Sequence, residues 1–145
     1  MSLRYKGDIH ILSSIIRMGN NGSSLDNATA GGLTCGFDKS GKLNDFATDH
    51  YNYEKFYSHP YSNFVFKDAQ IPNIDALYNL VIQAHHHLPY FDIVSWDIAM
   101  SDYNEPYIIE VNLRFQDLNF HQRNNGPLFG ELTTEILNKT IIENY

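Results

Sequence analysis

A β-hairpin pattern between Val94 and Asn112 constrains the fold of this chain more than any other feature of the sequence. Two apolar, β-branched runs, VSWDIAM and YIIEVN, are joined by turn-forming residues from Asp102 to Pro106. Such a pattern predicts two neighbouring antiparallel strands. The hairpin nevertheless carries three oxygen-bearing side chains, Asp97, Glu110 and Asn112, where a buried sheet would hold apolar ones.

Strand geometry places these three side chains together. Successive side chains alternate between the two faces of a strand, so Glu110 and Asn112 share a face. A turn centred between Tyr103 and Asn104 sets Asp97 directly opposite Glu110, where paired side chains lie roughly 5 Å apart at Cβ. We therefore expect two carboxylates and one amide oxygen to converge on one patch of the sheet.

Two interpretations of this patch are open. Two carboxylates at that separation repel each other, and a divalent cation between them removes the repulsion. Oxygen ligands without Cys or His suit Mg²⁺ or Mn²⁺ better than zinc, and such a site serves phosphoryl transfer or nucleotide-dependent activation. The alternative is that the acidic residues form a solvated face of the hairpin, a pattern that arises easily.

The order of the remaining elements predicts one α+β domain, in which an antiparallel sheet packs against helices. The 145 residues are enough for a single domain with one sizeable core. The expected elements are strands at residues 8–18 and 31–37, extended chain at 44–71, a helix from Ile71–Asn73 to Leu88, a loop at 113–127 and a last helix at 132–141.

Composition excludes several classes of function. The formal net charge of −7 argues against nucleic acid or an anionic membrane as the main partner. The single cysteine, Cys35, allows no intrachain disulfide, and its apolar surroundings in the sequence favour a buried thiol over a nucleophile. No apolar run reaches membrane-spanning length and the N-terminus lacks a secretory pattern, so we expect a cytoplasmic protein.

Three further groups of residues have weaker signals. Seven aromatic residues between Tyr51 and Phe66 either pack in the core, which is the default, or form a surface that stacks on carbohydrate. His85–His87 lie at the predicted end of a helix, where the helix dipole explains them better than metal binding. Gln116 and His121–Gln122 follow the hairpin and could face an acceptor substrate, on position alone.

The hairpin resembles the metal-binding core of the ATP-grasp superfamily, in which an Asp on one strand and Glu-x-Asn on the next hold two Mg²⁺ ions that bridge the phosphates of ATP. SWDIAM and EPYIIEVN are most similar to the sugar-transfer-associated ATP-grasp family, which is linked to hexapeptide-repeat transferases and bacterial polysaccharide genes. D-alanine–D-alanine ligases are a more distant resemblance. Arg17, Asp26–Asn27, Gly31–Gly32 and His59–Pro60 follow in that family's order, so the resemblance covers about residues 9–125.

The resemblance implies a role for each matching residue. Asp97 would bind one metal ion, Glu110 would bridge two, and Asn112 would bind the second. Arg17 would be a catalytic and phosphate-binding residue, because its guanidinium fork suits phosphate oxygens, although a surface arginine on a strand is the alternative. Asn27 is a further candidate for ATP binding, on the loop beside the phosphates.

The activity that the resemblance implies is Mg–ATP-dependent activation of a carboxylate as an acyl phosphate, followed by attack of an amine or similar nucleophile on a sugar-derived or other small substrate. Ser95 stands where D-alanine–D-alanine ligases carry arginine, which argues against a D-alanine substrate. The lysine-bearing central lobe has no counterpart in residues 1–145, so we expect a C-terminal catalytic lobe of a longer enzyme, inactive alone, in polysaccharide synthesis. The alternative is a non-catalytic carbohydrate-binding or scaffold domain with a degenerate nucleotide site.

Overall fold

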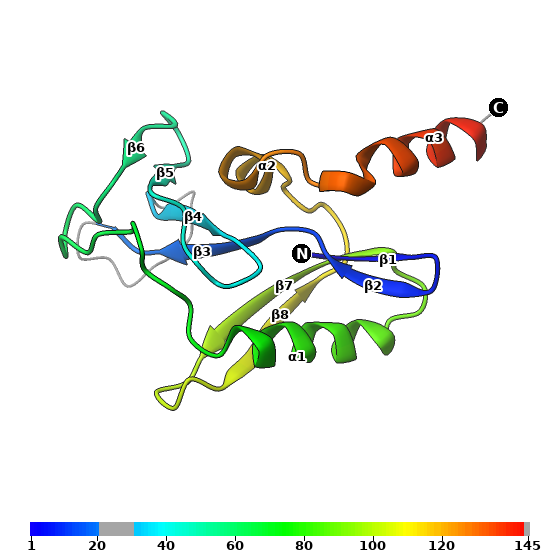
Figure 1. Cartoon of the computed structure of the whole chain (residues 1–145), viewed down its shortest axis with the longest axis horizontal. Helices are drawn as coiled ribbons and strands as arrows, with labels where there is room; N and C mark the ends of the chain where they lie inside the picture. The colour runs from blue at the N-terminus through cyan, green and yellow to red at the C-terminus, as the bar shows by residue number, and fades with distance from the viewer. Residues whose placement is uncertain (21–30, 144–145) are drawn as a thin grey trace.

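Two four-stranded antiparallel sheets and, in the described residues, three α-helices form an α+β fold (Figure 1). The structure is a computed structural model that describes residues 1–20 and 31–143. The strand orders are β2-β1-β7-β8 and β3-β4-β5-β6. The elements are β1 (Ser2–Tyr5), β2 (Asp8–Ile11), β3 (Ser14–Met18), β4 (Leu33–Phe37), β5 (Ala47–Asp49), β6 (Lys55–Phe56), α1 (Ile74–His86), β7 (Ile93–Met100), β8 (Pro106–Asn112), α2 (Asn119–Asn125), the 3₁₀-helix η2 (Gly130–Leu132) and α3 (Thr133–Glu143).

The first sheet packs against α1, as the helical periodicity before the hairpin predicts (Figure 1). His85, in the last turn of α1, is fully buried, and its Nδ1 lies 2.8 Å from Ser2 Oγ. The same hydroxyl accepts a hydrogen bond of 2.7 Å from Trp96 Nε1 on β7. His85 Nε2 lies 2.9 Å from the carbonyl oxygen of Phe91, so both ring nitrogens have partners. The expected placement of the histidines at the helix end is confirmed.

The start of α1 has no side-chain cap. Asn73 occupies the N-cap position with left-handed backbone angles, and its side chain makes no capping hydrogen bond. Its amide instead donates to the carbonyl oxygen of Asn104 at 3.0 Å. Because Asn104 lies in the turn of the β7–β8 hairpin, this contact connects the start of the helix to the tip of the hairpin.

The second sheet contains the apolar core. Its buried residues are Leu33, Cys35, Phe37, Leu43, Ala47 and Phe66. Cys35 is fully buried and free, as expected from its apolar surroundings in the sequence. Burial raises the pKa of its thiol to about 11, which opposes a role as a nucleophile at neutral pH.

The expected strand at residues 8–18 is two strands in two different sheets. β2 pairs with β1 in the first sheet and β3 pairs with β4 in the second, so the chain crosses between sheets at Leu12 and Ser13. Neither β1 nor α2 was predicted, and α2 occupies part of the expected loop at 113–127. The break at Leu12–Ser13 carries no Gly or Pro, which explains why the pattern reads as one strand.

The aromatic residues between Tyr51 and Phe66 were expected to pack in the core. Phe66 is fully buried, but most of its neighbours are exposed, so core packing is wrong for the segment as a whole. The exposed members are Tyr51, Tyr53, Tyr57, Tyr61 and Phe64, with exposed fractions from 49% to 69%.

Helix α3 extends away from the rest of the chain (Figure 1). The apolar face that predicts this helix is largely uncovered, since Leu137, Ile141 and Ile142 are exposed. No helix within residues 1–20 and 31–143 is both long and apolar enough to cross a membrane.

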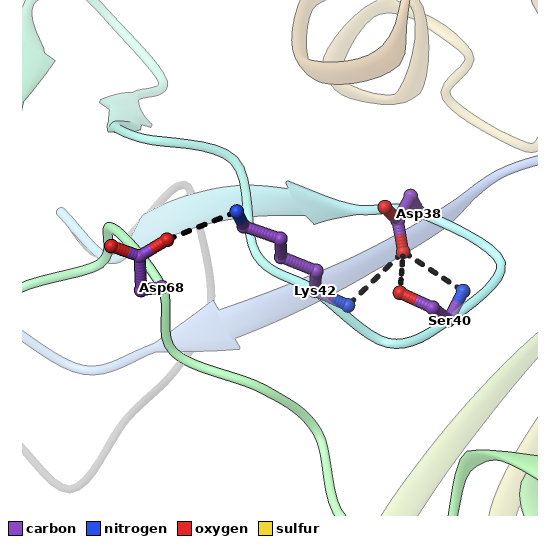
Figure 2. Close-up of polar contacts among 4 residues, drawn as sticks. All are labelled: Asp38, Ser40, Lys42 and Asp68. Atoms are coloured by element: carbon purple, nitrogen blue, oxygen red, sulfur yellow. Dashed lines mark hydrogen bonds and ion pairs between the residues drawn. The ribbon is translucent and has the colours of Figure 1, made fainter.

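The turn after β4 is held by one carboxylate (Figure 2). Asp38 Oδ1 accepts hydrogen bonds from the Ser40 amide, the Ser40 hydroxyl and the Lys42 amide, at 2.8, 2.7 and 3.1 Å. The hydrogen bond from the Ser40 hydroxyl is the main cause that lowers the pKa of Asp38. Lys42 Nζ then pairs with Asp68 at 3.0 Å, which fixes the segment leading towards α1.

Candidate metal and phosphate site

Asp97 on β7 and Glu110 on β8 are directly paired across the hairpin, which confirms the pairing predicted from the sequence. Ser95 pairs with Asn112 two residues further along. Directly paired residues of antiparallel strands lie on the same face, and the alternation of faces puts both pairs on one side. The two carboxylates and the amide therefore share one face of the first sheet.

The pairing depends on an irregularity that the sequence pattern did not reveal. Nearer the turn, Met100 pairs with Pro106 and Ile98 pairs with Ile108, so the turn is centred on Tyr103, half a residue earlier than expected. The register then shifts between Asp97 and Ile98. Ile109 is the extra residue of this β-bulge, and it restores the predicted pairing of the two carboxylates.

Arg17 reaches this face from the other sheet. It lies on β3, paired with Thr34 of β4, and its Nη2 is 3.3 Å from Asp97 Oδ2. The side chains of Arg17 and Asp97 are 34% and 28% exposed, so the pair is only partly screened by water. The structure thus brings together two residues that are 80 positions apart in sequence.

A cavity of about 600 Å³ adjoins this ion pair. Apolar residues of β3, β4 and α1 line it, including Ile16, Phe37 and Val81. Its polar lining residues include Ser95 and Asp97 of β7, Asn112 of β8 and, from the chain after β8, Arg114, Gln116, Asp117 and His121. Glu110 is exposed and is not one of the lining residues, so it lies beside the cavity rather than in it.

The donor set fits a hard divalent cation. Asp97 and Glu110 supply carboxylate oxygens and Asn112 supplies an amide oxygen, the ligand types that Mg²⁺ and Mn²⁺ prefer. Across the described residues, no group of three or more His, Cys, Asp or Glu side chains is placed to hold a metal ion. An ion at this hairpin would therefore need water or phosphate oxygens to complete its coordination, which is usual for magnesium.

Of the residues that could face an acceptor substrate, Gln116 and His121 line the cavity and Gln122 does not. Gln116 lines the cavity, where it accepts a hydrogen bond of 2.9 Å from the hydroxyl of Ser95 and donates at 3.1 Å to the carbonyl oxygen of Asn112. His121 is buried and also lines the cavity. Gln122 does not line it, and its side chain accepts from the backbone amide of Leu128 at 3.4 Å.

Two charged residues of the cavity were not predicted from the sequence, and one predicted residue is not placed. Arg114 and Asp117 both line the cavity. The sequence signal that could have identified them is their position, two and five residues after Asn112. The chain that follows a strand ending at the site passes close to the site. Asn27 lies outside the described residues.

Residues 4–137 match the family model described as sugar-transfer associated ATP-grasp. The matched range includes Arg17 and the whole β7–β8 hairpin, and it is most of the chain. The chain belongs to the sugar-transfer associated ATP-grasp family. It shows no significant match to a curated protein or to a solved structure.

Membership in the sugar-transfer associated ATP-grasp family confirms the resemblance that the hairpin shows in sequence. It indicates an ATP-dependent, ligase-type activity in a sugar-transfer context. The two antiparallel sheets with packed helices are consistent with an ATP-grasp domain.

Proposed function

We propose that this chain carries the metal and phosphate side of a Mg–ATP-dependent ligase that activates a carboxylate. The observation that supports this most is the direct pairing of Asp97 with Glu110, with Asn112 on the same face. Arg17 lies 3.3 Å from Asp97, so a guanidinium and three oxygen ligands meet beside one cavity. Phosphates of ATP need this combination, because metal ions and arginine both neutralise their charge.

In this proposal, Asp97, Glu110 and Asn112 would hold Mg²⁺ or Mn²⁺. The ion would supply neutralisation of the negative charge on the ATP phosphates. Arg17 binds a phosphate oxygen, and its contact with Asp97 keeps the guanidinium in place before the nucleotide arrives. Asn27 remains a proposed contributor to ATP binding.

The chemistry proposed has two steps. A carboxylate oxygen of the substrate attacks the γ-phosphorus of ATP, the bond to the β–γ bridging oxygen breaks, and ADP leaves. An amine nitrogen, or a similar nucleophile, then attacks the acyl carbon; the bond to the phosphate oxygen breaks, inorganic phosphate leaves and the nitrogen loses a proton. The apolar residues that line the cavity would keep water away from the acyl phosphate between the steps.

A second lobe is part of the proposal. Among the described residues that line the cavity, the cationic side chains belong to Arg17 and Arg114, and there is no lysine. We infer that lysines for the ATP phosphates come from another ATP-grasp lobe, in this protein or in another chain. We propose a small carboxylate, amine or sugar-derived substrate, and a setting in cytoplasmic steps of cell-surface polysaccharide synthesis. The sugar-transfer description of the family supports the link to sugars.

A thermal-shift experiment tests the metal ligands. Mg²⁺ or Mn²⁺ should raise the melting temperature of the wild-type chain, because a ligand that binds only the folded state stabilises it. Asp97→Asn and Glu110→Gln should remove this shift. Asp102→Asn is the matched control, since Asp102 is an exposed carboxylate in the turn of the same hairpin and should leave the shift intact. An equal shift in wild type and both ligand variants would mean that the ion binds elsewhere.

A non-catalytic carbohydrate-binding domain is the second candidate. The exposed side chains of Tyr51, Tyr53, Tyr57 and Tyr61 favour it, because tyrosine rings combine an apolar face with a polar hydroxyl. This candidate requires binding of an oligosaccharide without any divalent cation. Replacing Tyr57 and Tyr61 by Ser should abolish such binding and leave the metal-induced rise in melting temperature unchanged. The ligase proposal, in contrast, requires that rise in the wild-type chain.

A further inference from the structure

A hydrogen-bonded chain behind the cavity fixes the orientation of one buried histidine. His121 is only 7% exposed, and its Nδ1 lies 3.0 Å from the hydroxyl oxygen of Ser13. Asn125 Nδ2 donates to the same hydroxyl oxygen and to the carbonyl oxygen of Ser14, both at 2.8 Å. Asn44 Nδ2 lies 3.3 Å from Asn125 Oδ1, on the other side of that amide.

The partners in this chain favour one arrangement of the protons. The carbonyl oxygen of Ser14 can only accept, so the nitrogen of the Asn125 amide faces it, and that nitrogen also donates to Ser13 Oγ. Among the described residues, the acceptor then available to the hydroxyl proton of Ser13 is His121 Nδ1. The arrangement that satisfies this proton has Nδ1 as the acceptor, so we assign the imidazole proton to Nε2.

The second ring nitrogen of His121 is the one that can reach a ligand. His121 lines the same cavity as Asp97 and Asn112. Its Nε2 has no hydrogen-bond partner among the described residues, and it is not one of the fully enclosed polar atoms that lack a partner. The cavity that His121 lines is therefore the route by which we expect a ligand to reach this N–H group on an otherwise buried side chain.

We propose that His121, held in the Nε2–H form by Ser13 and Asn125, donates a hydrogen bond to the carboxylate or acyl oxygen of the substrate in this cavity. The inference rests on the proposed function, which requires such an oxygen beside the metal ligands. The donor is placed in advance by the protein, so it does not have to be reoriented when charge develops on the oxygen.

Burial keeps this donor neutral. Burial lowers the pKa of His121 to about 4, and the carboxylate of Asp117 opposes this shift. At neutral pH His121 is therefore a neutral donor. It cannot also act as a base through Nε2, because that nitrogen already carries the proton.

The first test observes the ring directly. Nitrogen-15 NMR spectra of the full chain at pH 7 should show His121 as the Nε2–H tautomer. Ser13→Ala should release this preference and give a mixture of tautomers. A ring protonated on Nδ1 in the wild type would overturn the proposal.

The second test measures ligand binding with acetyl phosphate and Mg²⁺, a probe that has both an acyl oxygen and a phosphoryl group. His121→Gln keeps a donor near the Nε2 position, whereas His121→Asn keeps only a group near Nδ1 that can contact Ser13. We expect binding within about twofold of wild type for the Gln variant and about tenfold weaker for the Asn variant, the loss of one hydrogen bond to a charged group. Equal affinities of both variants, or no binding to the wild type, would overturn the inference.

Asp97→Asn separates this inference from the proposed function. If Asp97→Asn weakens binding of acetyl phosphate and His121→Asn does not, the inference about His121 fails while the metal site stands. If His121→Asn weakens binding and Asp97→Asn changes neither the affinity nor its dependence on Mg²⁺, the metal site fails and the donor role of His121 stands.

Discussion

At the residue scale, Asp97 differs from Glu110 although the two carboxylates are directly paired. Asp97 is partly buried and contacts the guanidinium of Arg17 at 3.3 Å, whereas Glu110 is exposed. The positive charge of Arg17 therefore offsets the repulsion at Asp97, whereas Glu110 is screened by water alone. The two residues should respond differently to neutralisation when no metal ion is present.

Glu110→Gln should raise the free energy of unfolding of the metal-free chain by up to about 1 kcal/mol, because it removes a like charge directly across the strand pair. Asp97→Asn relieves the same repulsion but also removes the partner of Arg17, so we expect a smaller gain than for Glu110→Gln. Urea unfolding in the presence of a chelator measures both changes. Shifts of equal size and sign would show that the contact between Arg17 and Asp97 does not stabilise the fold.

The pH dependence of stability should report His121. In the unfolded chain a histidine titrates near pH 6.5, but burial lowers the pKa of His121 to about 4 in the folded chain. Between these values the unfolded state binds more protons, so stability falls as the pH falls, by at most roughly 1.4 kcal/mol per pH unit. Burial lowers the pKa of His85 as well, so it adds a change in the same direction.

His121→Gln isolates this contribution, because His85 remains. The difference in unfolding free energy between wild type and the variant should shrink as the pH is lowered from 7 to 5. Urea titrations at pH 7, 6 and 5 provide the comparison. A difference that stays constant over this range would show that His121 titrates normally in the folded protein.

At the element scale, the attachment of α2 to the second sheet depends on a glycine in β4. A Cβ at Gly36 would overlap the side-chain amide of Asn125 and would lie 2.6 Å from Asn44 Nδ2. This close approach lets Asn125 reach Ser13 and Asn44 at once. The residue that allows the approach is therefore also part of what orients His121.

Gly36→Ala should destabilise the protein by roughly 1–3 kcal/mol, the usual cost of overpacking a buried position. The cost should be smaller in an Asn125→Ala background, where the overlapping amide is absent. Urea unfolding of the two single variants and the double variant gives this coupling. Additive effects would mean that the added methyl group meets some other obstacle.

The hairpin and the place of the candidate ligands could be predicted because both are local. Alternation and a short turn decide which residues share a face, and the bulge at Ile109 compensated for the misplaced turn centre. The split at Leu12–Ser13 could not be predicted, because which sheet a strand joins depends on partners far along the chain. The helix α2 and the contact of Arg17 with Asp97 could not be predicted either, because both depend on residues far apart in the sequence. The expectation that the aromatic segment packs in the core was wrong, because composition does not show which elements pack over a segment.

At the scale of the whole molecule, the candidate site lies where residues of the two sheets meet. The hairpin of the first sheet supplies the oxygen ligands, and β3 of the second sheet supplies Arg17. Neither sheet alone contains the complete set. The cavity beside it is lined from both sheets and from α1, so changes in their packing should alter the site.

Nucleotide affinity should reflect the proposed absence of the lysine-bearing lobe. Each charge-assisted contact to phosphate contributes roughly 1.5–3 kcal/mol. Two missing contacts weaken binding by roughly a hundredfold or more, at about 1.4 kcal/mol per tenfold change. We therefore expect this chain alone to bind Mg–ATP more weakly than micromolar, to show no ligase turnover, and to bind tightly once an upstream lobe is added.

Calorimetric titration of Mg–ATP into this chain and its hairpin variants tests the central claim most directly. The account predicts weak binding to the wild type, the same binding to Asp102→Asn, and no measurable binding to Asp97→Asn or Glu110→Gln. Identical binding to all four proteins would contradict the proposed metal and phosphate site. Micromolar affinity of the wild type alone would contradict the proposal that a second lobe completes it.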